Sequence, residues 1–301
     1  MKILLTGASG QLGRELLPLL TGLGEVTPVD RAPGWPTTLE MDLADLDAVE
    51  RLLDHLQPDL LVNAAAYTAV DRAESPDRAP FRLNACLPDG LARWCARHDR
   101  LLLHYSTDYV FDGHSGQPYR EGDRTQPLNA YGESKLAGEW AIGASGCRHV
   151  ILRTSWVYST HGNNFVLTML NLARQRPELT IVKDQTGCPT WARNLAEVSA
   201  RLMRLALDPG ASPRPQGILH YCDADATTWY DFARLIFEQA VALGLLEALP
   251  RLKAIDTAEY QQRARRPLYS VLDTAVIRSE FGIQPPRLAE SLRDCLGELS
   301  R

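Results

Sequence analysis

Three glycines at three-residue spacing lie directly after the first apolar run of the chain. Gly7, Gly10 and Gly13 follow Ile3 to Thr6 and open a segment whose leucines recur at helical spacing. Glycines in such a strand–turn–helix unit let the backbone turn tightly and approach a pyrophosphate, which the free N–H groups of the helix N-terminus attract. A plain strand–turn–helix unit is the alternative, since a glycine triplet alone is weak evidence. Its place at the start of an alternating chain favours a dinucleotide site.

Short apolar runs alternate with amphipathic segments through the first half of the chain. Continuous apolar strands suit a parallel sheet that helices cover on both faces. We therefore predict an α/β fold, a doubly wound parallel (Rossmann) sheet, with an NAD(P)-binding domain over residues 1–155. Residues 156–301 are expected to form mainly a smaller substrate-binding lobe and to return some elements to the main sheet. The expected strands are Ile3 to Thr6, Val26 to Val29, Leu60 to Asn63, Leu101 to Ser106 and Val150 to Thr154.

Composition excludes several classes of protein. The chain has 301 residues, of which 45% are hydrophobic and 23% charged, and its net charge is -5. These proportions are typical of a folded protein, and the negative charge argues against a nucleic-acid-binding or membrane-surface role. The N-terminal apolar run is too short for a secretory signal, so we expect a cytoplasmic protein. Its 6 cysteines are scattered, which predicts reduced thiols and no disulfide framework.

An acidic and a basic residue end the second predicted strand. Asp30 can accept hydrogen bonds from an adenosine ribose, and Arg31 can face a 2′-phosphate. A solvated pair at a strand end is the alternative. As a cofactor contact, the pair predicts that both NADH and NADPH bind.

A tyrosine and a lysine, Tyr131 and Lys135, lie four residues apart and therefore on one face of a predicted helix. Chance is a poor explanation of this spacing, because the chain has only four lysines. A neighbouring ammonium group favours the phenolate and lowers the pKa of a phenol from its usual value of about 10. Upstream, the fifth strand runs into Ser106, Thr107 and Asp108, at the sheet edge where ligands bind in open α/β folds.

Together these features resemble the extended short-chain dehydrogenase/reductase family. The resemblance covers essentially the whole chain, and longer strings narrow it to reductases of nucleotide-linked keto sugars. Those strings are Asn63 to Asp71, Tyr105 to Gly113, Pro127 to Glu139, Arg153 to Tyr158, Asn163 to Phe165, Asp184 to Thr190, and Arg266-Pro267 with Ser270 and Leu272.

The resemblance implies reduction of the C4 ketone of dTDP-4-dehydro-L-rhamnose to dTDP-L-rhamnose, with NADPH or NADH as cofactor. It implies that Tyr131 is the proton donor, Lys135 the partner that lowers its pKa, and Thr107 a hydroxyl near the reacting oxygen. The implied substrate site comprises Thr107, Asp108, Tyr131, Lys135 and Trp156. The cofactor site expected from the glycine loop, the strand ends and the resemblance comprises Gly7, Gly10, Gln11, Leu12, Gly13, Asp30, Arg31, Asp42, Leu43, Ala64, Ala65, Ala66, Tyr131 and Lys135.

Two other functions remain open. A non-catalytic regulatory subunit can share the fold, although it has no reason to keep a tuned acid. An epimerase or dehydratase of another nucleotide sugar shares the tyrosine–lysine pair but recycles its cofactor. Stoichiometric consumption of NADPH on adding the keto-sugar nucleotide is expected of the reductase and of neither alternative.

One departure from the family concerns a metal. Some members resemble metal-bridged dimers that use the glutamate after the glycine loop, here Glu15, and a carboxylate that follows Pro189-Thr190. In this chain Arg193 stands where that carboxylate is expected. Because a cation there opposes a divalent metal, we predict no metal site and a solvated Glu15. The sequence leaves the oligomeric state open.

Overall fold

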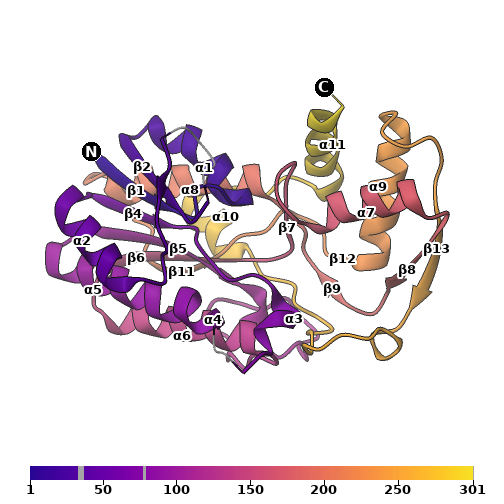
Figure 1. The fold of residues 1–301 in the computed structure, drawn as a ribbon, viewed down its shortest axis with the longest axis horizontal. Helices are drawn as coiled ribbons and strands as arrows, with labels where there is room; N and C mark the ends of the chain where they lie inside the picture. The colour runs from indigo at the N-terminus through magenta and orange to yellow at the C-terminus, as the bar shows by residue number, and fades with distance from the viewer. Residues whose placement is uncertain (33–36, 77–78, 301) are drawn as a thin grey trace.

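A computed structural model describes residues 1–32, 37–76 and 79–300. Its centre is a 7-stranded parallel sheet in the order β11-β6-β5-β4-β1-β2-β3 (Figure 1). All five predicted strands belong to it, so the predicted doubly wound α/β fold is confirmed. They are β1 (Lys2–Thr6), β2 (Glu25–Asp30), β4 (Leu60–Asn63), β5 (Leu101–Thr107) and β6 (Arg148–Thr154).

The strands of the central sheet are mainly apolar in their middle because helices cover both faces of the sheet. Alternate residues serve opposite faces: Ile3 and Leu5 pack with α1 (Gln11–Thr21), α8 (Ala192–Leu207) and α10 (Ala275–Phe281). Leu4, between them, packs on the other face, which is covered by α2 (Leu46–Leu56), α5 (Leu87–His98) and α6 (Ala130–Ala144).

The second half of the chain contributes to two regions. β11 (Gly217–His220) pairs with β6 and extends the main sheet, while α8 and α10 cover one of its faces. A separate apolar cluster joins α7 (Phe165–Gln175), α9 (Trp229–Ala242) and α11 (Leu288–Leu299) to β8 (Glu178–Val182), which pairs with β13 (Arg251–Ile255). The domain border near residue 155 stays a prediction.

Short elements connect these layers. They are β3 (Leu39–Glu40), β7 (Val157–Tyr158), β9 (Thr186–Gly187), β10 (Thr190–Trp191), β12 (Thr227–Thr228), α3 (Val70–Ala73), α4 (Ala79–Phe81), the π-helical turn η1 (Arg82–Cys86), and the 3-10 turns η2 (Asp108–Val110) and η3 (Thr257–Glu259). None of the helices in the described ranges is long and apolar enough to cross a membrane.

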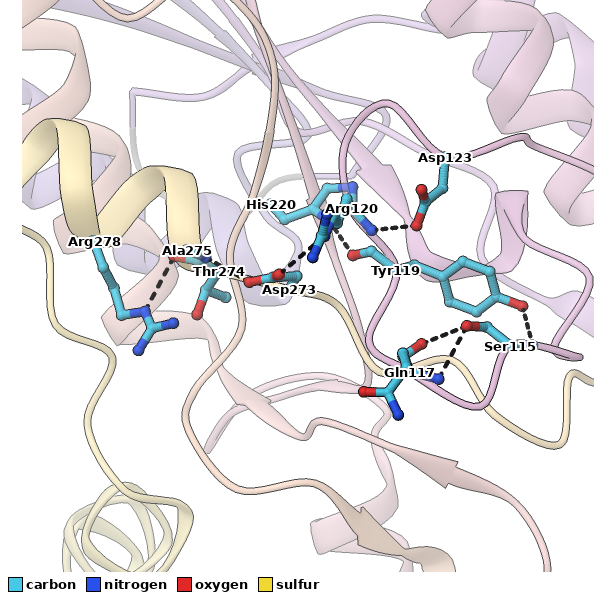
Figure 2. A network of polar contacts seen from close by, with 10 residues as sticks. All are labelled: Ser115, Gln117, Tyr119, Arg120, Asp123, His220, Asp273, Thr274, Ala275 and Arg278. Atoms are coloured by element: carbon cyan, nitrogen blue, oxygen red, sulfur yellow. Dashed lines mark hydrogen bonds and ion pairs between the residues drawn. The ribbon is translucent and has the colours of Figure 1, made fainter.

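A polar network ties the segment before α10 to the loop that follows β5 (Figure 2). The backbone N–H of Tyr119 donates to the Val271 carbonyl at 2.8 Å, and that of Asp273 donates to the Tyr119 carbonyl at 2.7 Å. From β11, His220 Nδ1 reaches the same Tyr119 oxygen at 3.1 Å. These bonds hold residues 271–273 beside the sheet and place the buried Ser270 close to the carboxyl end of β5.

Candidate active site

The carboxyl end of β5 carries two buried polar side chains. Thr107 is the last residue of the strand and Asp108 begins η2. The Thr107 hydroxyl donates to Asp108 Oδ1 at 3.0 Å and accepts from the Tyr109 N–H at 3.2 Å, which caps the turn. Both side chains are thereby fixed at the sheet edge where ligands bind in open α/β folds.

Helix α6 brings Tyr131 and Lys135 to the same edge. Asn129 caps the helix, its side chain accepting from the Gly132 N–H at 2.8 Å. Gly132 is required there, since a Cβ atom would lie 2.2 Å from the Tyr109 carbonyl oxygen. The close approach sets the Tyr131 ring edge-on to Tyr109, with centroids 5.9 Å apart, and a hydrogen bond links Tyr131 to Thr107.

Burial shifts the three titratable groups of this edge toward their neutral forms. It raises the pKa of Tyr131 to about 12, against the opposing hydrogen bond to Thr107. It lowers the pKa of Lys135 to about 8, with Glu139 opposing. It raises the pKa of Asp108 to about 7, although hydrogen bonds from Ser270 and Thr107 oppose it. The sequence predicts that Lys135 lowers the pKa of Tyr131, but the groups that act on Tyr131 here are Thr107 and Asp108, and burial raises its pKa.

The glycine loop forms a cradle with the segment after β4. Gly7 has a φ of +72°, and a Cβ atom on it would lie 2.5 Å from the Ala65 nitrogen. A Cβ atom on Gly13 would lie 2.1 Å from the Gly7 carbonyl. Helix α1 begins without a side-chain cap or an acidic residue in its first turn, so its N–H groups are suited to an anion. The cradle fits a dinucleotide pyrophosphate, and it places Gly7, Gly10, Gly13 and Ala64 to Ala66 together.

Asp30 ends β2 at the carboxyl edge of the sheet, and its side chain also binds the backbone of the glycine loop. Its carboxylate accepts from the Ser9 N–H at 2.9 Å and from the Arg31 N–H at 2.6 Å. The Asp30 carbonyl accepts from the Met41 N–H, which brings the exposed Asp42 and the buried Leu43 to the same side of the sheet. The side chain of Arg31 is exposed.

Gln11 links the glycine loop to the second half of the chain, a contact that sequence reasoning missed. Its side-chain oxygen accepts from Asn164 Nδ2 at 2.9 Å, and its side-chain nitrogen donates to the Asn163 carbonyl at 3.3 Å. Asn164 also caps α7, accepting from the Leu167 N–H at 3.0 Å. The adjacent asparagines were a visible signal, but nothing in their spacing pointed to Gln11.

A cavity of ≈ 490 Å³ lies between α7, β8 and residues 260–266. Trp156 does not line it but stacks on Trp229, which does, at 3.5 Å between ring centroids. Arg266 also lines the cavity, and its guanidinium binds the Asp71 carboxylate at 2.7 Å and hydrogen-bonds Tyr109. The cavity therefore adjoins the sheet edge that carries Thr107 and Tyr131. Sequence reasoning missed most of its walls: Phe165, Thr168, Met169, Leu172, Arg176, Glu178, Leu179, Thr180, Ile181, Val182, Gln185, Trp229, Tyr260 and Gln262.

The prediction of a solvated Glu15 is wrong. Helix α1 packs against α8, so Glu15 is buried, and Arg193 Nε donates to its carboxylate at 3.0 Å. Arg193 also pairs with Glu298 of α11. Within residues 1–32, 37–76 and 79–300, no group of three or more His, Cys, Asp or Glu side chains is placed to hold a metal ion.

The parallel sheet, the glycine cradle and the tyrosine–lysine pair define a nucleotide-binding protein of the short-chain dehydrogenase/reductase type. The family described as RmlD substrate binding domain matches residues 1–301, and the chain belongs to that family. It is 41% identical over 299 residues to the dTDP-4-dehydrorhamnose reductase of Escherichia coli strain K12, covering 99% of this chain and 98% of the relative. The same enzyme of Burkholderia thailandensis is 42% identical over 302 residues, covering 99% of each.

Solved structures agree. The dTDP-4-dehydrorhamnose reductase of Clostridium acetobutylicum superimposes with a TM-score of 0.89 at 35% identity, covering 100% of both chains. That of Bacillus anthracis, in complex with NADP, gives 0.87 at 30% identity, covering 99% of both chains. The predicted family and the predicted class of oxidoreductase are confirmed. A UDP-glucose 4-epimerase of Thermus thermophilus, at 22% identity and a TM-score of 0.79 over 98% of both chains, shares the fold alone.

Proposed function

We propose that this chain reduces the C4 ketone of dTDP-4-dehydro-L-rhamnose to dTDP-L-rhamnose, with NADPH or NADH as the reductant. The observation that carries the proposal is the meeting of Thr107, Tyr131 and Lys135 at one sheet edge beside the glycine cradle. Relatives named for this reaction, one of them solved with NADP, support the substrate and the cofactor.

The nicotinamide supplies a hydride to the ketone carbon when it is bound. Tyr131 donates its phenolic proton to the resulting alkoxide oxygen, and the hydrogen bond between Tyr131 and Thr107 orients the phenol. An alkoxide is a far stronger base than a phenolate, so a buried phenol with a pKa of about 12 is still a sufficient acid. Lys135 stands one turn further along α6 and would offer its amino group to the cofactor ribose.

The cofactor would lie over the carboxyl ends of β1, β2 and β4. Gly7, Gly10 and Gly13, with Gln11 and Leu12, would hold the pyrophosphate, and Asp30 and Arg31 the adenosine ribose and its 2′-phosphate. Asp42 and Leu43 would flank the adenine, and Ala64 to Ala66 would leave room beneath the chain of the cofactor.

The nucleoside of the substrate would lie in the cavity between α7 and β8. Its volume of ≈ 490 Å³ falls within the range of small-ligand sites. Phe165, Met169 and Leu172 give it an apolar wall, and the Arg266 guanidinium offers charge at the end nearest Tyr109. This placement directs the sugar toward Thr107 and Asp108, past Trp156, and gives residues 156–301 the larger share of substrate contacts.

The experiment is to add dTDP-4-dehydro-L-rhamnose to the protein with NADPH and to follow cofactor absorbance and product identity. We expect one NADPH oxidised for each ketone reduced. A dTDP sugar without a ketone is the control and should cause no loss of absorbance. Turnover of a nucleotide sugar without net loss of NADPH would indicate an epimerase or dehydratase. Absence of any turnover would favour a regulatory subunit.

A further inference from the structure

A row of polar side chains crosses the interior of the sheet and ends at Lys135. Thr6 of β1 is the register partner of Asn63 of β4, which is in turn the partner of His104 of β5. None of the three is more than 1% exposed. The residues two positions earlier, Leu4 and Leu61 among them, belong to the apolar cluster beneath α5 and α6. Buried polar groups in such surroundings are costly unless each has a partner.

Hydrogen bonds connect the row without a break. The Thr6 hydroxyl donates to Asn63 Oδ1 at 2.7 Å, and Asn63 Nδ2 lies 3.0 Å from His104 Nδ1. His104 Nε2 lies 3.2 Å from Lys135 Nζ, which donates to the Tyr105 carbonyl at 2.5 Å. Every polar atom of the row therefore has a partner, from β1 to α6.

The direction of these bonds fixes the charge that suits Lys135. An amide nitrogen can only donate, so His104 Nδ1 accepts from Asn63 and the proton of the neutral ring sits on Nε2. Nε2–H then points at Lys135, which accepts it as a neutral amine. Burial and the nearby Lys135 hold the pKa of His104 well below its ordinary value, so the ring stays neutral in this position.

The same heavy atoms also suit the opposite direction. An ammonium on Lys135 donates to His104 Nε2, the other ring tautomer donates from Nδ1 to the Asn63 side-chain oxygen, and the amide nitrogen donates to the Thr6 hydroxyl oxygen. The reversal requires three changes: the Asn63 amide turns over, the ring changes tautomer, and the Thr6 hydroxyl turns from donor to acceptor. A partner that could only accept would favour the ammonium, and one that could only donate would favour the amine.

We propose that Thr6, Asn63 and His104 form a reversible chain of hydrogen bonds whose direction sets whether Lys135 carries a proton. His104 is then a positioning residue for Lys135. This deepens the role of Lys135 in the proposed function, on which its catalytic meaning rests, but the row exists without any substrate.

The other titratable groups around Lys135 act on it, or on His104, independently of the row. On its own helix it faces Tyr131 and Glu139, and Glu139 raises its pKa. Glu139 is itself paired with Arg153 of β6 at 2.6 Å. His149, also on β6, acts on His104 electrostatically.

The test is a titration of Lys135 in the full-length protein by NMR. The chain has four lysines, so protein labelled with carbon-13 at the lysine side chains gives few signals, and the one missing in Lys135→Arg belongs to Lys135. Asn63→Asp leaves a group that only accepts, which turns His104 Nε2 toward accepting. We expect the Lys135 midpoint to rise by about one pH unit or more. His104→Phe removes the ring from both directions of the row. Because the ammonium then loses a charge-assisted hydrogen bond that is stronger than the bond lost by the amine, the midpoint should fall by about one unit.

A double variant separates the row from simple attraction between charges. The new carboxylate of Asn63→Asp favours the ammonium by itself, whatever the ring does. In Asn63→Asp with His104→Phe, the row predicts that most of the rise is lost. A rise that persists in full without the ring would overturn the proposal.

Two further variants guard against effects of folding. His104→Gln keeps a donor and an acceptor, so its midpoint should stay near that of the wild type even if His104→Phe fails to fold. Ser199→Ala removes the 2.8 Å partner of the Tyr105 hydroxyl, a buried contact outside the row, and should leave the midpoint unchanged. A shift in Ser199→Ala equal to that in His104→Phe would overturn the proposal, as would one in His104→Gln. Because no substrate is used, these results stand apart from the NADPH assay of the proposed function.

Discussion

Two regions bury their side chains in opposite ways. One is the sheet edge with Asp108, Tyr131 and Lys135, the proposed catalytic edge, and the other is the cavity lined by Phe165 and Trp229. At the edge, burial holds Tyr131, Lys135 and Asp108 near their neutral forms, so each charge it forms is costly. In the cavity, Phe165 and Trp229 bury rings against each other at 4.5 Å between centroids. Substitutions should therefore act on stability with opposite sign in the two regions. The edge holds its titratable groups at a cost in stability, whereas the packed rings of the cavity stabilise the fold.

The largest effect should come from Tyr131→Phe. The change keeps the ring and its packing on Tyr109 but removes the proton that the alkoxide needs. We expect turnover to fall by about 10²- to 10⁴-fold, the range typical of general acid catalysis, while NADPH and dTDP still bind. Turnover is measured by NADPH absorbance, and binding by calorimetry.

Tyr158→Phe is the matched control for Tyr131→Phe. The Tyr158 hydroxyl is buried and, within the part of the chain that the structure describes, has no hydrogen-bond partner. Its loss should leave the rate within a few-fold of the wild type. Near-normal turnover in Tyr131→Phe would remove Tyr131 from the chemistry and would reduce the catalytic edge to a structural feature.

Asp108→Asn should make the protein more stable at pH 8. Burial raises the pKa of Asp108 from 3.8 to about 7, so the folded state holds a proton that the unfolded chain has already lost. The resulting destabilisation grows from about pH 4 to about pH 7 and then levels off. Asparagine never ionises, so we expect a gain in the free energy of unfolding of about 2 to 4 kcal/mol at pH 8.

The measurement is urea unfolding of the wild type and Asp108→Asn at pH 8 and pH 4.5. The gain should be much smaller at pH 4.5. That pH is less than one unit above the unfolded pKa of 3.8, so holding the proton in the folded state then costs only about 1 kcal/mol. An equal gain at both values would mean that packing, and not ionisation, distinguishes the two side chains.

Arg31→Ala extends the comparison to the cofactor end of the edge, where side chains are exposed and not buried. A guanidinium that binds the 2′-phosphate contributes a charge-assisted hydrogen bond, so NADPH should bind about 10- to 100-fold more weakly in the variant. NADH lacks the phosphate and should bind within a few-fold of the wild type. Dissociation constants for both cofactors decide this. Equal small effects would show that Arg31 does not contact the phosphate.

Local patterns in the sequence were enough to place Thr107, Tyr131 and Lys135 on the elements that carry them. The predicted strands ended at or within one residue of the observed ends, and the four-residue spacing put Tyr131 and Lys135 on one face of α6. The glycine spacing likewise predicted the turn at Gly7. Each of these features depends on a few neighbouring residues, so the strand, turn and helix rules suffice.

Contacts between distant segments were not predictable in the same way. Glu15 meets Arg193 because α1 packs on α8, and residues 178 apart carry no common pattern. The Asn63–His104 contact depends on register between two strands, which the apolar runs leave undetermined. The walls of the cavity come from α7, β8 and residues 260–266, where a sequence shows only ordinary apolar positions.

Phe165→Leu should have the smallest effect of these substitutions. It best tests whether ligand binding in the cavity is independent of cofactor binding at the glycine cradle. The change keeps an apolar side chain but removes the ring that contacts Trp229 and, at 5.6 Å, Phe232. Aromatic pairs contribute about 0.5 to 1.5 kcal/mol beyond the area they bury, so dTDP should bind about 2- to 12-fold more weakly and the protein should be slightly less stable. NADPH affinity should not change, since the ring does not reach the glycine cradle. Calorimetry with each ligand tests this. Equal weakening of NADPH would instead mean that α7 and the glycine loop respond as one unit through the Asn164–Gln11 hydrogen bond, and the two regions would then no longer be independent.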